Sequence, residues 1–293
     1  MKKVFQPFVL ICAITSVLWV GCKSERAEKG NSFESADAFF DQHKQEEQTL
    51  VLDTGGTGPI IGKMGTRIYA DSSIFMDANG NDVSYPIILK LIELYPAGDI
   101  LLYRTPTIGS GGQLLRSGGE IKLTAYKDGQ ALSLKPGKNI PVDMPSTNPE
   151  TGMTIFSGSG DPPTAWTDHT IAIQTTVGYY QAFPDYLGWI NCDKLYSFTG
   201  DKTNIQFEVD GTGGENIALF VVFDNFLSVL TVSDLLSPEV PVGETVTIIG
   251  IAMDKQGNYR LHQSQETIAT GMTVTLDMQE KTEQEVLDAV AAL

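Results

Sequence analysis

The sequence predicts an all-β protein with two β-sandwich-like or open-barrel domains, a short N-terminal helix and a C-terminal capping helix. From Thr49 onward, short runs of alternating apolar and polar residues are separated by turn-forming residues, which is typical of half-buried strands. The run from Ile121 to Ala125 shows this alternation best. Asp128-Gly129 suits a type I′ hairpin turn, and Pro136-Gly137 suits a type II turn. The number and spacing of these runs favour one sandwich or open barrel per domain.

Residues 1–21 have the pattern of a lipoprotein signal peptide. Lys2 and Lys3 form a basic start, an almost entirely apolar run covers residues 8–20, and Gly21 follows. A helix over that run would be about 20 Å long, which is shorter than the ~30 Å hydrocarbon core of a bilayer. We therefore expect an export signal rather than a membrane span.

The pair Gly21-Cys22 resembles the lipobox of bacterial lipoproteins, in which the cysteine thiol receives a lipid and becomes the mature N-terminus. Trp19 stands where that pattern prefers leucine, and the alternative is an ordinary signal peptide that contains a cysteine. Lys23 and Glu25 resemble the surface-export signal of Bacteroidota lipoproteins. The resemblance implies an outer-membrane protein, exposed at the cell surface and attached to the membrane by acyl chains such as palmitate.

The remaining chain divides into a tether and two predicted domains. Residues 22–31 are polar and lack periodicity, so they are expected to be the tether. Residues 32–170 are assigned to the first β domain, whose N-terminal helix would be capped by Ser32 and would cover residues 33–47. Residues 171–293 are assigned to the second β domain, and a Pro-, Gly- and Ser-rich stretch at 145–163 lies near the end of the first.

The second domain contains its own strand and helix signals. Residues 217–223, "IALFVVF", are apolar on both faces and predict a central strand covered on each side. Asp224-Asn225 is expected to turn this strand into the next, and residues 256–258 to form the tip of another hairpin. Thr282 and Glu285 form a capping-box pattern for a short amphipathic helix that would seal one end of this domain.

Composition limits the range of functions. Removal of residues 1–21 takes away two of the 20 basic residues and none of the 36 acidic ones, which leaves a net charge of −18. Such a chain is unsuited to nucleic acid, whose phosphates need a basic surface. Of the three cysteines, Cys12 leaves with the signal and Cys22 is lipidated, so Cys192 has no partner for an intrachain disulfide.

A longer resemblance covers most of residues 49–293. Its parts are a Gly-Thr strand at 65–66, a D-x-x-G turn at 77–80, an L-x-SGG turn at 115–119 and "LGWINCDKLY" at 187–196. These stretches resemble a module of uncharacterised Bacteroidota-type envelope lipoproteins with a Gly-Trp-Ile-Asn-x-Asp motif. The resemblance implies an exported β-rich scaffold related to surface adhesion or assembly, and it transfers no catalytic residue.

The sequence offers no catalytic constellation, cofactor motif or metal-ligand cluster. Cys192 has two histidines, His169 and His262, as conceivable partners, but a lone cysteine in an apolar stretch is usually a buried hydrophobe. The segment from Asp77 to Asp82 lacks the spacing of an EF-hand loop and is expected to be a hairpin turn. We therefore expect no enzyme activity, no cofactor and no metal ligand.

Aromatic residues are densest between residues 179 and 198, where polar side chains are interleaved. One interpretation is a glycan-binding site, because flat rings stack on sugars while amides and carboxylates order the hydroxyls. The candidate ligand-binding residues are Trp166, Tyr179, Tyr180, Tyr186, Trp189 and Asp193. The other interpretation, which we prefer, is that these rings join the two domains.

The predicted function is accordingly a lipid-anchored envelope protein with a scaffold, adhesion or protein-binding role. A glycan-binding surface lipoprotein is the alternative, and an envelope hydrolase is a distant third. Exposure of Trp189 and its neighbours distinguishes the first two hypotheses, because a glycan platform needs open ring faces and a domain junction needs buried ones.

Overall fold

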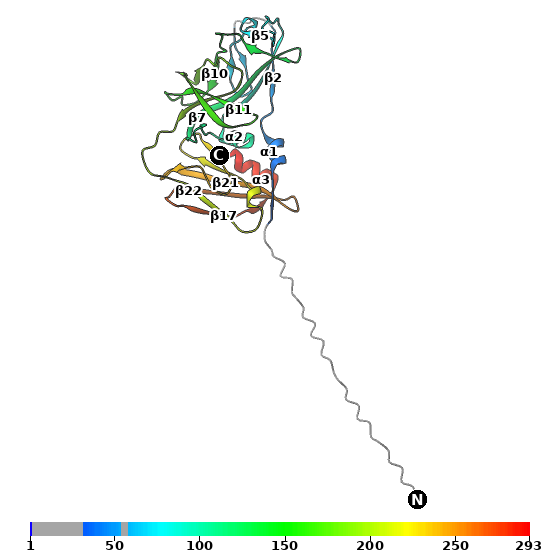
Figure 1. The fold of residues 1–293 in the computed structure, drawn as a ribbon, viewed down its shortest axis with the longest axis vertical. Coiled ribbons are helices and arrows are strands. Elements are labelled where there is room, and N and C mark those ends of the chain that lie inside the picture. The colour runs from blue at the N-terminus through cyan, green and yellow to red at the C-terminus, as the bar shows by residue number, and fades with distance from the viewer. Residues whose placement is uncertain (2–31, 54–57) are drawn as a thin grey trace.

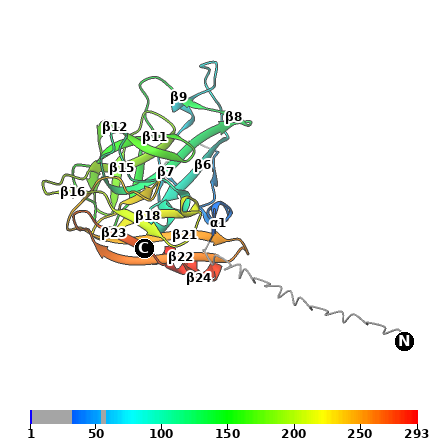
Figure 2. The ribbon, with the colours of Figure 1, turned by 60° about the horizontal axis from the view of Figure 1, so that its bottom comes forward.

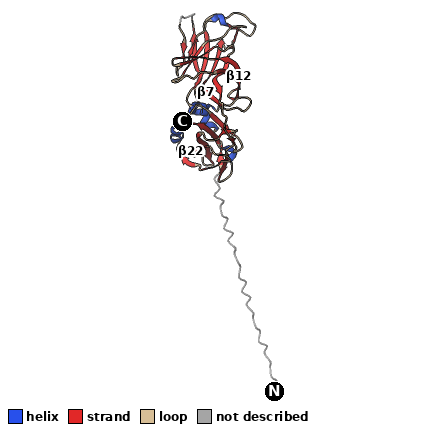
Figure 3. Ribbon diagram, turned by 90° about the vertical axis from the view of Figure 1, so that its left-hand side faces the viewer, coloured by secondary structure: helices blue, strands red, loops and turns tan. Residues whose placement is uncertain are grey.

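The structure is a computed structural model that describes residue 1, residues 32–53 and residues 58–293. The predicted signal peptide, Cys22 and the tether therefore lie outside the described residues. The described chain is mostly β-strand, and its short α-helices lie between two sets of sheets (Figures 1 and 3). None of the helices in these described ranges is long and apolar enough to cross a membrane.

The first sandwich has a seven-stranded sheet facing a five-stranded sheet. The larger sheet has the order β12-β11-β15-β7-β6-β2, with β8 paired to β7. Its strands are β2 (Gln48–Leu52), β6 (Ile87–Leu94), β7 (Leu115–Lys127), β8 (Gln130–Ala131), β11 (Thr154–Gly160), β12 (Pro163–Ala172) and β15 (Gly188–Leu195). The smaller sheet has the order β13-β14-β10-β4-β3. Its strands are β3 (Ile60–Ile61), β4 (Arg67–Ile68), β10 (Val142–Pro145), β13 (Gln174–Thr176) and β14 (Tyr179–Ala182). A short pair, β5 (Phe75–Met76) and β9 (Ser133–Leu134), lies beside them.

The second sandwich is built on a six-stranded sheet of order β19-β18-β21-β22-β24, with β1 paired to β21. Its strands are β1 (Phe33–Glu34), β18 (Ala218–Phe223), β19 (Val229–Val232), β21 (Thr245–Asp254), β22 (Tyr259–Thr267) and β24 (Gln279–Lys281). Two small pairs complete it: β16 (Lys202–Thr203) with β20 (Val240–Pro241), and the parallel pair β17 (Gln206–Val209) with β23 (Thr273–Leu276). Figure 2 shows the long strands β21 and β22 lying across the base of the molecule.

Three α-helices form a layer between the sandwiches: α1 (Asp37–His43), α2 (Ala97–Tyr103) and α3 (Glu283–Ala291). Two 3₁₀ turns, η1 (Ser72–Ile74) and η2 (Gly214–Asn216), lie elsewhere. Helix side chains such as Phe40, Leu101 and Val286 share one buried cluster with Trp189 of the first sandwich and Phe220 of the second. The two halves are therefore joined by a common hydrophobic core rather than by a linker.

The predicted central strand is confirmed as β18. Phe220 and Val222 face the helix layer, whereas Leu219, Val221 and Phe223 face the core of the second sandwich. Successive side chains of a strand point to opposite faces, so a strand between two cores must be apolar at every position. The uninterrupted apolar run reflects this position.

The predicted domain boundary between residues 170 and 171 is wrong. It falls inside β12, and the strands that follow it pair with the first sandwich: β14 with β10, and β15 with both β7 and β11. The first sandwich therefore extends to Leu195. Alternation identifies a strand but does not reveal its pairing partner, which is decided by contacts far apart in the chain.

The predicted N-terminal helix over residues 33–47 is shorter than expected. Phe33 and Glu34 form a strand paired with β21 of the second sandwich, and the helix covers only Asp37–His43. Ser32 forms a bridge with Thr212 instead of capping the helix. The Phe33 amide donates to the Thr212 carbonyl at 3.0 Å, so the backbone is extended where the apolar stripe suggested a helix.

Several local signals are confirmed. Asp128 and Gly129 have φ angles of 49° and 79° in the hairpin between β7 and β8, as a type I′ turn requires. The Thr282–Glu285 capping box begins α3. However, α3 packs between α2 and β22 in the middle of the molecule, and does not seal an end of the second domain (Figure 1).

The predicted L-x-SGG turn is instead a β-bulge inside β7. Asn191 pairs with Glu120 and Asp193 pairs with Ser117, so β7 has one extra residue at this point. Gly119 has a φ of 117°, which a residue with a side chain rarely adopts. As a result, Ser117 and Glu120 both lie beside polar residues of β15.

Candidate functional site

The two predicted stacking tryptophans are buried in the shared core. Trp166 has 0% of its surface exposed and Trp189 has 3%. Their rings meet edge to face at 6.3 Å, and Tyr103 of α2 packs on Trp189 at 5.2 Å. The Trp166 indole donates to the Pro106 carbonyl at 2.9 Å. The assignment of these rings to sugar stacking is wrong, because neither has an open face.

The other predicted ligand residues do not gather at one place. Tyr180 is buried, and its hydroxyl accepts a hydrogen bond from the Glu150 amide at 2.8 Å. Asp193 is also buried, so it cannot reach a ligand at the surface. Tyr179 and Tyr186 are half-buried and lie apart, Tyr179 under Arg67 in the five-stranded sheet and Tyr186 against the core of the first sandwich.

The cysteine considered as a nucleophile is inaccessible. Cys192 is fully buried, and burial, reinforced by the Asp193 charge, raises the pKa of its thiol well above the usual value. Neither candidate histidine is bonded to it: His169 bonds Ser157 at 2.7 Å, and His262 accepts from the Asp277 amide at 3.0 Å. The Cys192–histidine pairing considered from the sequence is therefore not formed.

The segment from Asp77 to Asp82 is a turn, as predicted. One Asp77 carboxylate oxygen accepts from the amides of Asn79 and Asn81, both at 2.8 Å. In residues 32–53 and 58–293, no group of three or more His, Cys, Asp or Glu side chains converges as a metal site.

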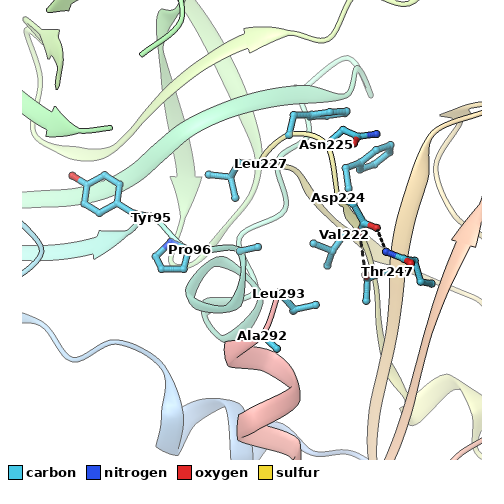
Figure 4. Close-up of a pocket in the computed structure, with 13 residues that line it drawn as sticks. Tyr95, Pro96, Val222, Asp224, Asn225, Leu227, Thr247, Ala292 and Leu293 are labelled. Atoms are coloured by element: carbon cyan, nitrogen blue, oxygen red, sulfur yellow. Dashed lines mark hydrogen bonds between the residues drawn. The ribbon is translucent and has the colours of Figure 1, made fainter. Parts of the chain in front are cut away.

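A groove lies at the junction of the two halves. It consists of two adjoining pockets of about 540 Å³ and 470 Å³. Both pockets are lined by Tyr95, Pro96, Phe226 and Leu227. One wall comes from the segment that joins β6 to α2, and the other comes from the turn between β18 and β19 (Figure 4). The groove exists only because the sandwiches are packed together, so no local sequence pattern indicated it.

The first pocket has an acidic polar side. Asp224 is exposed, and it accepts hydrogen bonds from Thr247 at 3.0 Å and from Gln265 at 2.6 Å. Asn225 is exposed next to it, while Leu227 and Leu293 line the apolar side (Figure 4). The sequence indicated Asp224-Asn225 only as a turn, because turns and binding loops use the same residue types.

The second pocket has an ion pair on its wall. Arg116 and Lys194 both pair with Glu150, the latter at 2.7 Å. Burial would raise the pKa of Glu150, but the two cations outweigh it and lower that pKa. The single carboxylate balances only one of the two cations, so one positive charge is left over beside this pocket.

An aromatic stack supports the wall between the pockets. Phe226 lies between Tyr196 at 4.4 Å and Phe223 at 4.9 Å, in nearly parallel planes. Burial, together with the hydrogen bond to Glu244, raises the pKa of Tyr196 to about 12. Phe226 is itself buried, and the Arg116 guanidinium lies over its ring at 5.5 Å, so it shapes the groove and does not offer a stacking surface.

Three buried carboxyl groups lie in the seven-stranded sheet. Glu93 accepts hydrogen bonds from Gln48 at 2.7 Å and from the amides of Met64 and Thr66, both at 2.9 Å. By contrast, neither oxygen of Glu120 and only one of Asp193 has a hydrogen-bond partner among the described residues. Burial raises the pKa of both Glu120 and Asp193 well above the ordinary range.

Comparison with known proteins identifies no family. No family profile and no curated protein matches this chain. Among solved structures, a γ-CGTase from alkalophilic Bacillus clarkii has 10% sequence identity and a TM-score of 0.17. The match covers 80% of this chain but only 41% of that enzyme. At this level the likeness carries no argument about fold or activity.

Proposed function

We propose that this chain is a lipid-anchored cell-envelope protein that acts by binding a protein partner, in a scaffold or adhesion role. The junction groove is the observation that carries the proposal. Its walls come from both sandwiches, and the shared core holds these walls in place. Binding sites are commonly found where two domains meet. The anchor would be the lipid on Cys22.

The groove fits an extended peptide segment of the partner. Its two adjoining pockets have an apolar middle at Pro96 and Leu227, which suits an apolar side chain. Asp224 at one end presents an exposed carboxylate, which favours a basic side chain there. The net charge of −18 that remains without residues 1–21 favours a basic partner as well.

A glycan is a weaker proposal for this chain. The sugar-stacking hypothesis depended on Trp166 and Trp189, which are buried. In the groove, Phe226 is buried and packs on Tyr196 and Phe223, so it offers no ring face to a pyranose.

Site-specific crosslinking tests the groove. A photoreactive amino acid replaces Asn225, which is exposed at the groove, in cells that make the full chain. Gln256 is the matched control, because it is an exposed turn residue at the opposite end of β21. We expect one defined protein adduct from position 225 and none from position 256. Identical adducts at both positions, or no protein adduct at 225, would contradict the proposal.

Metabolic labelling tests the anchor. An alkyne-tagged palmitate fed to the producing cells should label the wild-type chain, and Cys22→Ala should remove both the label and the membrane fractionation. Labelling that persists in Cys22→Ala would place the lipid elsewhere and refute this anchor.

A further inference from the structure

The carboxyl groups of Glu120 and Asp193 form a buried polar cluster beneath the groove. Glu120 is fully buried and both of its oxygens lack a partner. Asp193 Oδ1 also lacks one, whereas its Oδ2 accepts from the side-chain Nδ2 of Asn191 at 2.7 Å. Ser117 donates to Asn191 Oδ1 at 3.1 Å. Buried polar atoms without partners are rare in folded proteins and need an explanation.

The β-bulge brings these groups together. Glu120 lies directly across from Asn191, and Ser117 lies directly across from Asp193. Directly opposed residues in an antiparallel pair have Cβ atoms about 5 Å apart. Thr105, shortly after α2, adds a buried hydroxyl close enough to Glu120 to oppose the rise in the pKa of that carboxyl, although the hydroxyl itself donates to the Ile100 carbonyl at 3.5 Å. The cluster thus collects carboxylate, hydroxyl and amide oxygens, and it contains no nitrogen or sulfur ligand.

The same sheet contains a control. Glu93 is as buried as Glu120, yet three donors satisfy its two oxygens. At Glu93, where only this chain contacts the buried carboxylate, the fold provides hydrogen-bond donors for both oxygens. Glu120 and Asp193 receive too few donors, which indicates that something other than this chain meets their unpartnered oxygens.

We propose that Glu120 and Asp193 bind one divalent cation of the calcium type between them, with Ser117 and Thr105 as neutral oxygen ligands. The cation satisfies the unpartnered oxygens of both carboxylates and cancels their two charges. Protonation of one carboxyl gives it a donor for the other but leaves a single buried charge, whereas the cation cancels both charges. Ca²⁺ fits better than Zn²⁺ or Mg²⁺, because it accepts oxygen-only ligand sets in irregular geometry.

The second pocket adjoins the cluster through Ser117. Ser117 and Gly118 line the second pocket, and Ser117 is bonded to Asn191 within the cluster. A cation held there would link β7 and β15 to the residue that follows α2. The proposed ion is therefore structural, and it would stiffen the junction that forms the groove.

Metal binding by the full chain, purified in detergent, tests the proposal. After treatment with EGTA, the protein is titrated with Ca²⁺, Mg²⁺ or Zn²⁺, and native mass spectrometry counts the bound ions. We expect one Ca²⁺ per chain and, at a hundredfold excess over Kd, a rise in Tm of about 5–10 °C. Glu120→Gln and Asp193→Asn should each weaken Ca²⁺ binding by at least about tenfold.

Two controls keep the result decisive. Glu93→Gln should lower Tm but leave Ca²⁺ affinity unchanged, because that carboxylate belongs to a separate, satisfied set. If the cluster variants do not fold, terbium luminescence excited through tryptophan tests in wild-type protein whether the bound ion lies close to the buried tryptophans. A wild-type chain that binds no Ca²⁺, Ca²⁺ affinity unchanged in Glu120→Gln, or terbium bound without sensitised emission would each overturn the proposal.

Discussion

The contact between α2 and α3 decides whether replacing Gly98 by alanine stabilises or destabilises the protein. A Cβ atom at Gly98 of α2 would lie 2.5 Å from the Val290 carbonyl oxygen and 3.2 Å from Val290 Cγ1. Real Cβ atoms essentially never approach another heavy atom within 3.0 Å. The neighbour is backbone, so it cannot rotate away. Gly98 thus permits the close approach of the two helices that lie between the sandwiches.

We expect Gly98→Ala to destabilise the protein, although glycine-to-alanine substitutions in open helices stabilise. Helix propensity alone would favour alanine by about 1 kcal/mol. Overpacking against a neighbouring backbone typically costs about 1–3 kcal/mol, and α3 also contributes Val286 and Val290 to the shared core. Because a 2.5 Å contact with backbone forces a shift, the upper part of that range, about 2–3 kcal/mol, applies, and subtracting the propensity gain leaves an expected net loss in unfolding free energy of about 1–2 kcal/mol.

Urea denaturation followed by far-ultraviolet circular dichroism measures this loss. A variant that is equally stable, or more stable, would refute the reasoning. A second background isolates the contact: a chain that ends at Ala289 lacks the Val290 carbonyl. In that background Gly98→Ala should be neutral or stabilising, because only the propensity effect remains. An equal cost in both backgrounds would show that the contact is not its source.

Substitutions at three further positions test other parts of the structure. Trp189→Ala should lower the free energy of unfolding by about 3–5 kcal/mol, and Trp189→Phe by clearly less, because the ring fills the shared core. Urea denaturation measures both losses, and a loss near zero would contradict the burial of this ring. Burial raises the pKa of Asp254, but hydrogen bonds led by Arg260 outweigh it and lower that pKa to about 2. The stabilisation is therefore present above the ordinary pKa of about 4 and is lost as pH falls through about 2. Asp254→Asn should lower the free energy of unfolding at pH 6 and should make that free energy fall less between pH 4 and pH 2. A fall between pH 4 and pH 2 equal to that of the wild-type protein would contradict this. Thr282→Ala should lower the free energy of unfolding by about 1 kcal/mol, because it removes the capping box that begins α3, and Thr282→Ser should lower it much less. Equal thermal midpoints for the two variants would contradict that role.

Local signals in the sequence predicted local structure well. The turn at Asp128-Gly129, the capping box at Thr282 and the two-faced apolar strand at 218–223 are present as expected. Each depends on interactions within a few residues or on a single strand's burial, and these leave a direct pattern. The same reasoning was less successful with Ser117-Gly118-Gly119, because a glycine pair suits a turn and a bulge equally well.

The sequence by itself determined the all-β class, the strands and turns, and the apolar character of the aromatic run. Only the tertiary structure decided that residues 171–195 complete the first sandwich and that Trp166 and Trp189 lie in a core shared by both halves. It also decided that a groove lies beside Asp224 and that Glu120 is near Asp193. The physical reason is that periodicity reports which faces of an element are buried, whereas strand partners and junction contacts join residues far apart in the chain.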